Sequence, residues 1–204
     1  MKTYLKTIKY TQQILLAISV MLMMVLPLML VFWSDSISYD NTQFLYMVSH
    51  VTLLFVMVIR PLADIFTQTK LIRPLVILRK GFGVLSASII VSFILAKLMV
   101  DPVAYVQGLT SLPYWSMRDY ALLAHLGDIS AVILLITSNN LSKKLLGTMW
   151  KKIQKLSYVY FYASALYVCL TYSDGYQLLA MVLVSYVTYL AFVKNKERII
   201  QNNI

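Results

Sequence analysis

The chain has little of what a soluble enzyme needs. Of its 204 residues only eight are acidic, two are histidine and one is cysteine. The single cysteine, Cys169, excludes a disulfide framework and a thiolate metal cluster. The sequence also has no phosphate-binding glycine loop, no HExxH motif and no convincing Ser/His/Asp set. An active site of the soluble type therefore finds no support.

Apolar residues are abundant instead. Hydrophobic residues make up 60% of the chain and charged residues 13%, which is more apolar surface than a soluble fold of this length can bury. Six apolar stretches of roughly 17 to 21 residues are each long enough to cross about 30 Å of hydrocarbon. The first is too long for a signal peptide and has no cleavage site after it, so we expect it to remain as a helix. We predict an all-α, six-helix membrane bundle forming one domain, 1–204, with spans at 13–33, 43–60, 82–100, 120–138, 156–173 and 175–193.

The charges predict the topology of these spans. Sixteen of the eighteen basic residues precede the first span, follow the last, or lie in the second and fourth connections. By the positive-inside rule, we expect both termini on the cytoplasmic side of the membrane. We expect that membrane to be the inner membrane of the cell. This asymmetry accounts for the net charge of +10, so we expect a lipid bilayer as partner and no nucleic acid. The basic residues concerned are Lys2, Lys6, Lys9, Arg60, Lys70, Arg73, Arg79, Lys80, Lys143, Lys144, Lys151, Lys152, Lys155, Lys194, Lys196 and Arg198.

The second connection is the longest. Pro61 and Pro74 are expected to interrupt regular helix there, because proline lacks an amide donor. Between them, apolar side chains can lie at the headgroup boundary while basic ones face water and phosphate. Two interpretations remain open, a connector that lies along the membrane and a docking surface for an anionic cofactor or partner.

Four segments carry a family resemblance. They are IRPLADIF after the second span, LIRPLVILRKGFGVLSASIIV into the third, RDYALLAHLGDISAVILLITSNN along the fourth and KKLLGTMWKKIQKLSYVY into the fifth. With the six-span topology, they resemble the ferric-reductase-like transmembrane domain family, and within it the MsrQ/YedZ type of haem-binding membrane subunit. The similarity covers about residues 45–170.

The resemblance implies haem sites whose ligands this chain lacks. In the family, histidines of the third and fifth helices hold a pair of haem b groups. The matching positions here are Phe93, Gln154 and Tyr167. Phenylalanine has no lone pair for iron, an amide is a poor ligand, and a tyrosine phenolate needs a strongly lowered pKa. We therefore expect the family-type haem pair to be absent.

The best candidate for a site is a set of four polar residues. We place them in the outer half of the membrane, away from the basic connections. His125 and Asp128 are three residues apart and share a helix face, and Lys97 and His50 reach a similar depth from two other helices. Because an aspartate near mid-bilayer is costly, we predict that these four residues converge on one inward-facing pocket. Such a pocket could bind a quinone headgroup or another ligand, or form a proton path. A purely structural pair, isolated histidines bonded to neighbours, an ion pair of Lys97 with Asp101, and a haem between His50 and His125 remain alternatives; no other metal site is predicted.

Two functions remain open. The first is a membrane subunit of an electron-transfer assembly that is not catalytic on its own and holds a partner protein, a flavin or a quinone. The second is a non-redox scaffold, assembly factor or small-solute carrier that keeps only the family's helical frame.

Overall fold

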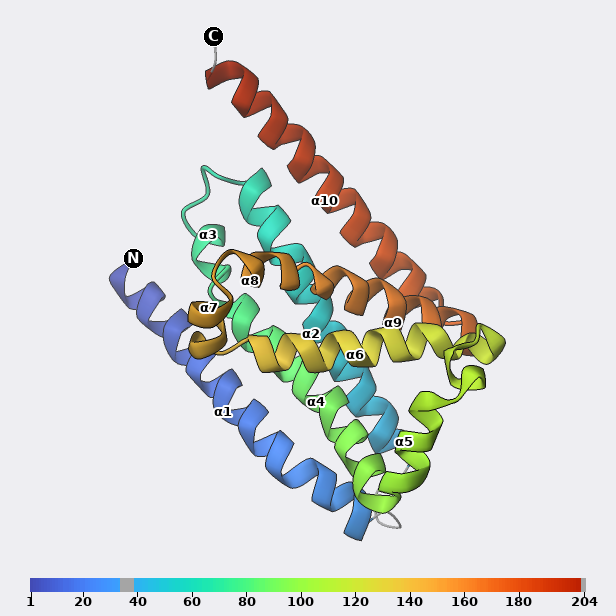
Figure 1. The fold of residues 1–204 in the computed structure, drawn as a ribbon. Coiled ribbons are helices and arrows are strands. Elements are labelled where there is room, and N and C mark those ends of the chain that lie inside the picture. Colours follow the sequence, from blue (N-terminus) through green and yellow to red (C-terminus); the bar gives the residue numbers. More distant parts are fainter. Residues whose placement is uncertain (34–38, 203–204) are drawn as a thin grey trace.

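The computed structural model describes residues 1–33 and 39–202, and it confirms an all-helical fold (Figure 1). No strand occurs in this part of the chain. The elements are α1 (Lys2–Phe32), α2 (Tyr39–Ile65), α3 (Ile72–Leu75), α4 (Leu78–Val100), α5 (Pro102–Thr110), the 3₁₀ turns η2 (Leu112–Trp115) and η3 (Arg118–Tyr120), α6 (Ala121–Thr137), α7 (Asn140–Leu146), α8 (Thr148–Ile153), α9 (Leu156–Tyr172) and α10 (Gly175–Asn202).

Five helical stretches in the described residues are long and apolar enough to cross a membrane. They are Lys2–Phe32, Tyr39–Ile65, Ile72–Val100, Arg118–Thr137 and Gly175–Ile199. The sixth predicted span, 156–173, corresponds to α9, which has 17 residues. At 1.5 Å per residue α9 is about 26 Å long, somewhat less than the hydrocarbon thickness. The structure thus shows a multi-pass helical protein with five candidate spans.

Small residues bring α1 close to α4. A Cβ added to Gly81 of α4 would lie 3.0 Å from Leu15 Cδ1 of α1, so glycine permits the contact. Further along, Ser92 of α4 is fully buried; its hydroxyl donates to the Ser88 carbonyl at 2.7 Å and lies 3.5 Å from the Leu22 carbonyl of α1. Small residues at helix contacts are typical of membrane bundles. Lipid removes the hydrophobic driving force between helices, so close packing of their backbones holds them together.

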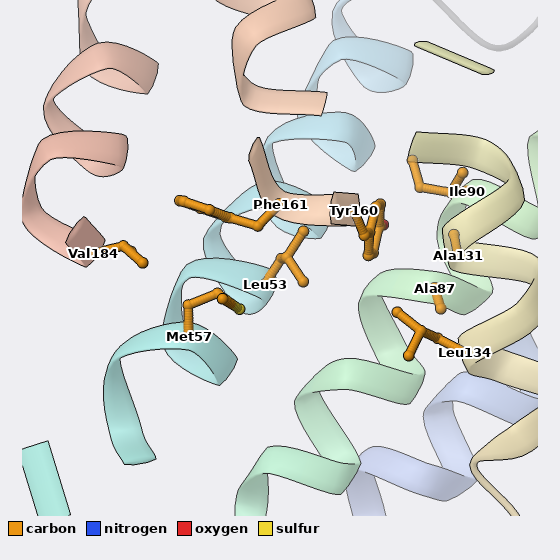
Figure 2. Close-up of a cluster of buried hydrophobic side chains, with 9 residues drawn as sticks. All are labelled: Leu53, Met57, Ala87, Ile90, Ala131, Leu134, Tyr160, Phe161 and Val184. Carbon is orange, nitrogen blue, oxygen red and sulfur yellow. The ribbon is translucent and has the colours of Figure 1, made fainter. Parts of the chain in front are cut away.

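The core lies where α2, α4, α6, α9 and α10 meet (Figure 2). Phe161 of α9 is its largest fully buried side chain, at 2% exposed. Small residues such as Ala87 and Ala131 let the helices around it approach closely. The buried cluster consists of Leu53, Met57, Ala87, Ile90, Ala131, Leu134, Tyr160, Phe161 and Val184.

The basic segments meet at one end of the bundle, here called the basic end, which comprises the start of α1, the α2–α4 connection, α7, α8 and the last turns of α10 (Figure 1). The Tyr4 hydroxyl at the chain's start donates to the Leu71 carbonyl at 2.9 Å. The Lys194 ammonium lies 6.0 Å from the Phe66 ring. These contacts tie distant segments together at the end where the sequence concentrates positive charge.

Pro61 and Pro74 were expected to interrupt regular helix, and this is wrong for Pro61, whereas the short helix that contains Pro74 ends one residue after it. α2 continues through Pro61 to Ile65, and Pro74 lies inside α3. A proline removes one donor from the helix ladder, and in membrane helices the neighbouring groups can compensate for that loss. The α2–α4 connection therefore consists of a helix extension, a short turn and α3.

Residues 101–120 connect α4 to α6 at the opposite end of the bundle and are here called the cap. The predicted spans treat this stretch only as a connection, yet it contains α5, η2 and η3. The Asp101 carboxylate accepts a hydrogen bond from Ala104 N at 2.8 Å, and Pro102 occupies the first turn of α5. Aspartate at the N-cap followed by proline is a strong helix start, so the dipeptide Asp101–Pro102 signals this helix in the sequence. This hydrogen bond holds the Asp101 carboxylate in the cap. The alternative ion pair of Lys97 with Asp101 does not occur among the described residues.

Candidate functional site

A cavity of about 160 Å³ lies between α4, the cap and α6. Apolar side chains form most of its wall, His125 and Asp128 of α6 contribute an imidazole and a carboxylate, and Tyr105 and Tyr114 of the cap contribute phenol groups. Ile129 lines the cavity and is also 39% exposed, so the cavity is open toward the side of the bundle. The lining residues are Ile94, Tyr105, Leu109, Tyr114, His125, Asp128, Ile129, Val132 and Ile133.

His125 is held by the aromatic residues of the cap. Its ring stacks on Tyr114, with ring centroids 3.4 Å apart and planes 10° from parallel. Trp115 meets the same ring edge-on at 6.0 Å. The Nδ1 atom of His125 is nevertheless buried and has no hydrogen-bond partner among the described residues. A buried nitrogen without a partner is costly, so this imidazole has an unused hydrogen bond to offer.

Asp128 lies one turn further along α6, on the same cavity wall. Within residues 1–33 and 39–202 its carboxylate forms no hydrogen bond and no ion pair. Lys97 is close enough to interact electrostatically with Asp128 and with His125, yet its own side chain is exposed and does not line the cavity. The structure thus brings His125 and Asp128 together and places Lys97 beside them.

His50 lies elsewhere. Its Nδ1 donates to the Tyr46 carbonyl at 2.8 Å, which fixes the proton on that nitrogen, and its buried Nε2 is without a hydrogen-bond partner in the described chain. The backbone of Ser164 in α9 approaches this ring, and the same residue packs against Gly127 of α6. Because α9 comes between His50 and α6, the four predicted residues do not line one cavity.

The cap closes the cavity from the end of the bundle. Trp115 Nε1 donates to the Leu109 carbonyl at 2.7 Å, which ties η2 to α5. The chain enters α6 through two consecutive left-handed residues, Asp119 at φ 53° and Tyr120 at φ 57°. Burial raises the pKa of Tyr114 to about 12, so its hydroxyl stays protonated at neutral pH. The cap is thus an aromatic wall whose position depends on a tight, sterically disfavoured turn.

A second polar group, which the sequence patterns did not single out, lies at the junction of α2, α4 and α9. The Tyr160 hydroxyl is 3.2 Å from Ser49 Oγ and 2.9 Å from Ser86 Oγ, and the two serine oxygens are 3.0 Å apart. All three residues are buried. We call them the hydroxyl triad. The signal for it is the run of small polar residues in VLSASIIVS, which is unusual in an apolar span.

The three positions that the family uses for haem ligands make other contacts. Phe93 stacks on Tyr46 with ring centroids 4.5 Å apart, and Gln154 Nε2 donates to Thr137 Oγ1 at 3.5 Å. Tyr167 is half-buried near the far end of α9. These side chains do not fit a bis-imidazole haem. The geometry does not favour a haem between His50 and His125 either, because α9 lies between them.

The described residues contain no group of three or more His, Cys, Asp or Glu side chains that could hold a metal ion. No protein-family model, no curated protein and no solved structure matches the chain. The family resemblance therefore rests on the sequence motifs alone, and the cavity beside His125 and Asp128 is the structural feature that bears on function.

Proposed function

We propose that the chain is a membrane subunit of an electron-transfer assembly and that it binds the ring of a quinone in the cavity between α4, the cap and α6. The observation that carries the binding step is that His125 and Asp128 line that cavity one helical turn apart, and that the buried Nδ1 of His125 has no hydrogen-bond partner among the described residues. The electron-transfer setting follows from the resemblance to ferric-reductase-like proteins.

The size and chemistry of the cavity support a quinone ring. A void near 150 Å³ holds one benzene-sized ring, so about 160 Å³ suits a single planar headgroup and is too small for the three fused rings of a flavin. A quinone carbonyl needs a hydrogen-bond donor, which the His125 imidazole can supply. Apolar side chains such as Ile94 and Val132 suit the rest of the ring.

The route of entry fits a lipid-soluble ligand. Ile129 lies both on the cavity wall and on the exposed side of α6, where lipid would contact a spanning helix. A ligand with a long isoprenoid tail can then place its ring in the cavity and leave the tail among lipid chains. A water-soluble substrate would instead have to pass the aromatic cap.

Titration of the purified protein in nanodiscs with a short-chain ubiquinone analogue tests this binding. Trp115, whose ring is 6.0 Å from that of His125, reports the ligand through fluorescence quenching. His125→Phe keeps an aromatic ring against Tyr114 but loses the nitrogen, so we expect roughly tenfold weaker binding. The matched control is His50→Phe, which removes another buried imidazole nitrogen outside the cavity and should bind as the wild type does.

Equal binding by the wild type and His125→Phe would contradict the proposal. Saturable binding that only the His50→Phe variant loses would move the site to α2. Absence of any quinone binding, together with an optical spectrum showing neither haem nor flavin, would favour the non-redox scaffold or carrier.

The orientation is part of the same proposal. The basic end carries the lysines and arginines of four separate segments, which supports placing it, with both termini, on the cytoplasmic side of an inner membrane. A reporter that is active only in the cytoplasm, fused after Lys194, should be active. Activity of a reporter that works only outside the membrane at the same position would contradict this orientation.

A further inference from the structure

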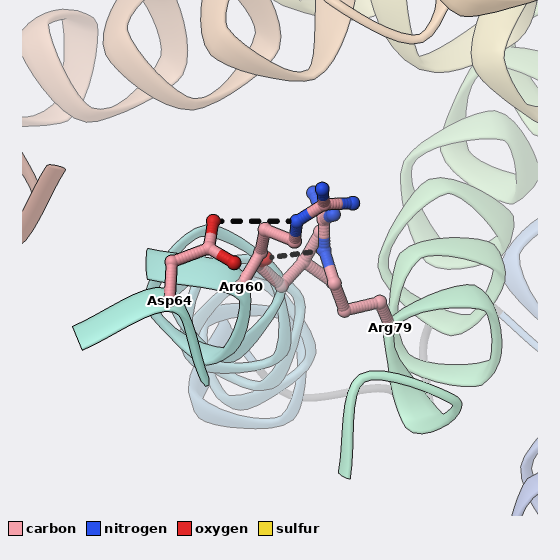
Figure 3. A network of polar contacts seen from close by, with 4 residues as sticks. Arg60, Asp64 and Arg79 are labelled. Atoms are coloured by element: carbon pink, nitrogen blue, oxygen red, sulfur yellow. Dashed lines mark hydrogen bonds and ion pairs between the residues drawn. The ribbon is translucent and has the colours of Figure 1, made fainter. Parts of the chain in front are cut away.

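Two arginines of different helices meet at the basic end. Arg79, in the first turn of α4, reaches across to α2, where its Nε donates to the Val56 carbonyl at 3.0 Å. Arg60 of α2 pairs with Asp64 one turn later, with Nε and Oδ2 3.5 Å apart. Figure 3 shows the three side chains meeting beside the last turns of α2. The positive charge of Arg60 acts on Arg79 across this gap.

The charges of this group do not balance. Two guanidinium groups face one carboxylate, and the Asp64 carboxylate bonds Arg60 and not Arg79 in the described chain. The Nε bond fixes the plane of the half-buried Arg79 guanidinium, while its terminal nitrogens have no hydrogen-bond partner among the described residues and are not sealed from their surroundings. Holding two like charges together is unfavourable unless an anion lies between them.

The position indicates which anion fits. The group lies at the ends of two candidate spans, α2 and the stretch that contains α4, where lipid headgroups would be found. Tyr158 of α9 lies near Arg79 and is exposed, as tyrosines at a membrane interface often are. A guanidinium with a fixed plane and two free nitrogens is suited to bidentate binding of a phosphate.

We propose that Arg60 and Arg79 form a binding site for a phosphate group, supplied by an anionic phospholipid. The terminal nitrogens of Arg79 bind two phosphate oxygens, Arg60 adds the second positive charge, and the Asp64 carboxylate weakens the attraction. The site bridges α2 and α4 at the turn where Arg79 already bonds the Val56 carbonyl. Bound phosphate would therefore stabilise the contact between these two helices.

The test compares thermal unfolding in nanodiscs of phosphatidylcholine alone with nanodiscs that also contain phosphatidylglycerol. Each variant is compared with itself in the two lipids, so a loss of intrinsic stability cancels. We expect phosphatidylglycerol to raise the wild-type midpoint by roughly 3 °C, as a ligand specific for the folded state does. Arg79→Gln and Arg60→Gln should each lose most of this rise.

Two further variants separate a built site from general attraction to negative lipid. Lys80→Gln removes an exposed positive charge next to Arg79 and should keep the full rise. Asp64→Asn removes the competing carboxylate, so the rise should become larger. A loss in Lys80→Gln equal to that in Arg79→Gln, or a smaller rise in Asp64→Asn, would overturn the proposal.

A last arm identifies the source of the phosphate. Inorganic phosphate is added to phosphatidylcholine nanodiscs against chloride at equal ionic strength. A rise that depends on Arg79 would support the phosphate site with a soluble ligand, while a rise only with phosphatidylglycerol would support the lipid. If neither raises the midpoint, the site does not bind phosphate.

Discussion

The bundle contains two polar groups that differ in how far their hydrogen bonds are satisfied. In the hydroxyl triad, each of Ser49, Ser86 and Tyr160 bonds both of the others, and all are buried. At the cavity, His125 keeps a buried nitrogen without a partner, and Asp128 is unpaired within the described part of the chain. A closed network stabilises a bundle, whereas an incomplete one beside a cavity is the arrangement expected of a binding site.

The triad belongs to the same packed region as the hydrophobic core, so the largest effects on stability are expected there. Phe161→Ala leaves a cavity next to Tyr160 and should lower the free energy of unfolding by about 3–5 kcal/mol. The matched control is Phe192→Ala on α10, because Phe192 is 67% exposed and should cost little. Denaturant titration in micelles measures both. Equal losses would mean that α9 is not the centre of the packing.

The triad itself is tested by removing one oxygen. Tyr160→Phe leaves Ser49 and Ser86 bonded to each other, and we expect a loss of about 1–2 kcal/mol in the free energy of unfolding. Tyr162→Phe is the control, because the Tyr162 hydroxyl bonds Ser185 at 2.8 Å in an exposed position. Its loss should be smaller. A Tyr160→Phe variant as stable as the wild type would show that the triad adds nothing to stability.

Sequence reasoning could predict the five helices that are long and apolar enough to span a membrane, because this property depends only on the run of apolar residues; the sixth predicted span, 156–173, is not among them. It could not predict which buried polar groups meet. Ser49, Ser86 and Tyr160 are 37 and 74 residues apart along the chain, and their meeting depends on how three helices rotate against one another. His125 and Asp128 were predicted together because they are one helical turn apart.

The errors have a common origin. His50 was placed with His125 by depth alone, yet depth does not show that α9 passes between α2 and α6. Lys97 is close enough to Asp128 to interact with it electrostatically, but its side chain is exposed and does not line the cavity. Helix α5 was missed because its start depends on the cap residue Asp101 and not on hydrophobic periodicity.

A smaller effect is expected where the cap meets the site. Tyr114→Leu removes the ring that stacks on His125 but keeps an apolar side chain, so it should cost about 0.5–1.5 kcal/mol of stability. The freed imidazole should also bind the quinone analogue more weakly, because its orientation is lost. Denaturant titration and fluorescence quenching measure the two effects. Unchanged binding in this variant would mean that the cap does not position His125.

The smallest effect on stability is expected for Asp128→Asn, which like Tyr160→Phe is a nearly isosteric change at a polar side chain. A carboxylate at the centre of a spanning helix costs some 2.5 to 3.5 kcal/mol on insertion scales. Asp128 has no hydrogen-bond or ion-pair partner in the described residues, and only the longer-range attraction of Lys97 offsets that cost. Removing its charge therefore breaks no bond, and we expect the free energy of unfolding to stay within about 0.5 kcal/mol or to rise.

Binding of the ubiquinone analogue should change in Asp128→Asn although stability does not. If Asp128 helps to hold the quinone ring or its proton, Asp128→Asn should weaken binding of the ubiquinone analogue while the protein remains folded. Tyr160→Phe should show the reverse, reduced stability with unchanged binding. If Asp128→Asn instead lowers stability by more than about 1 kcal/mol and leaves binding intact, the carboxylate is a structural group like the triad, and the distinction between the two regions fails.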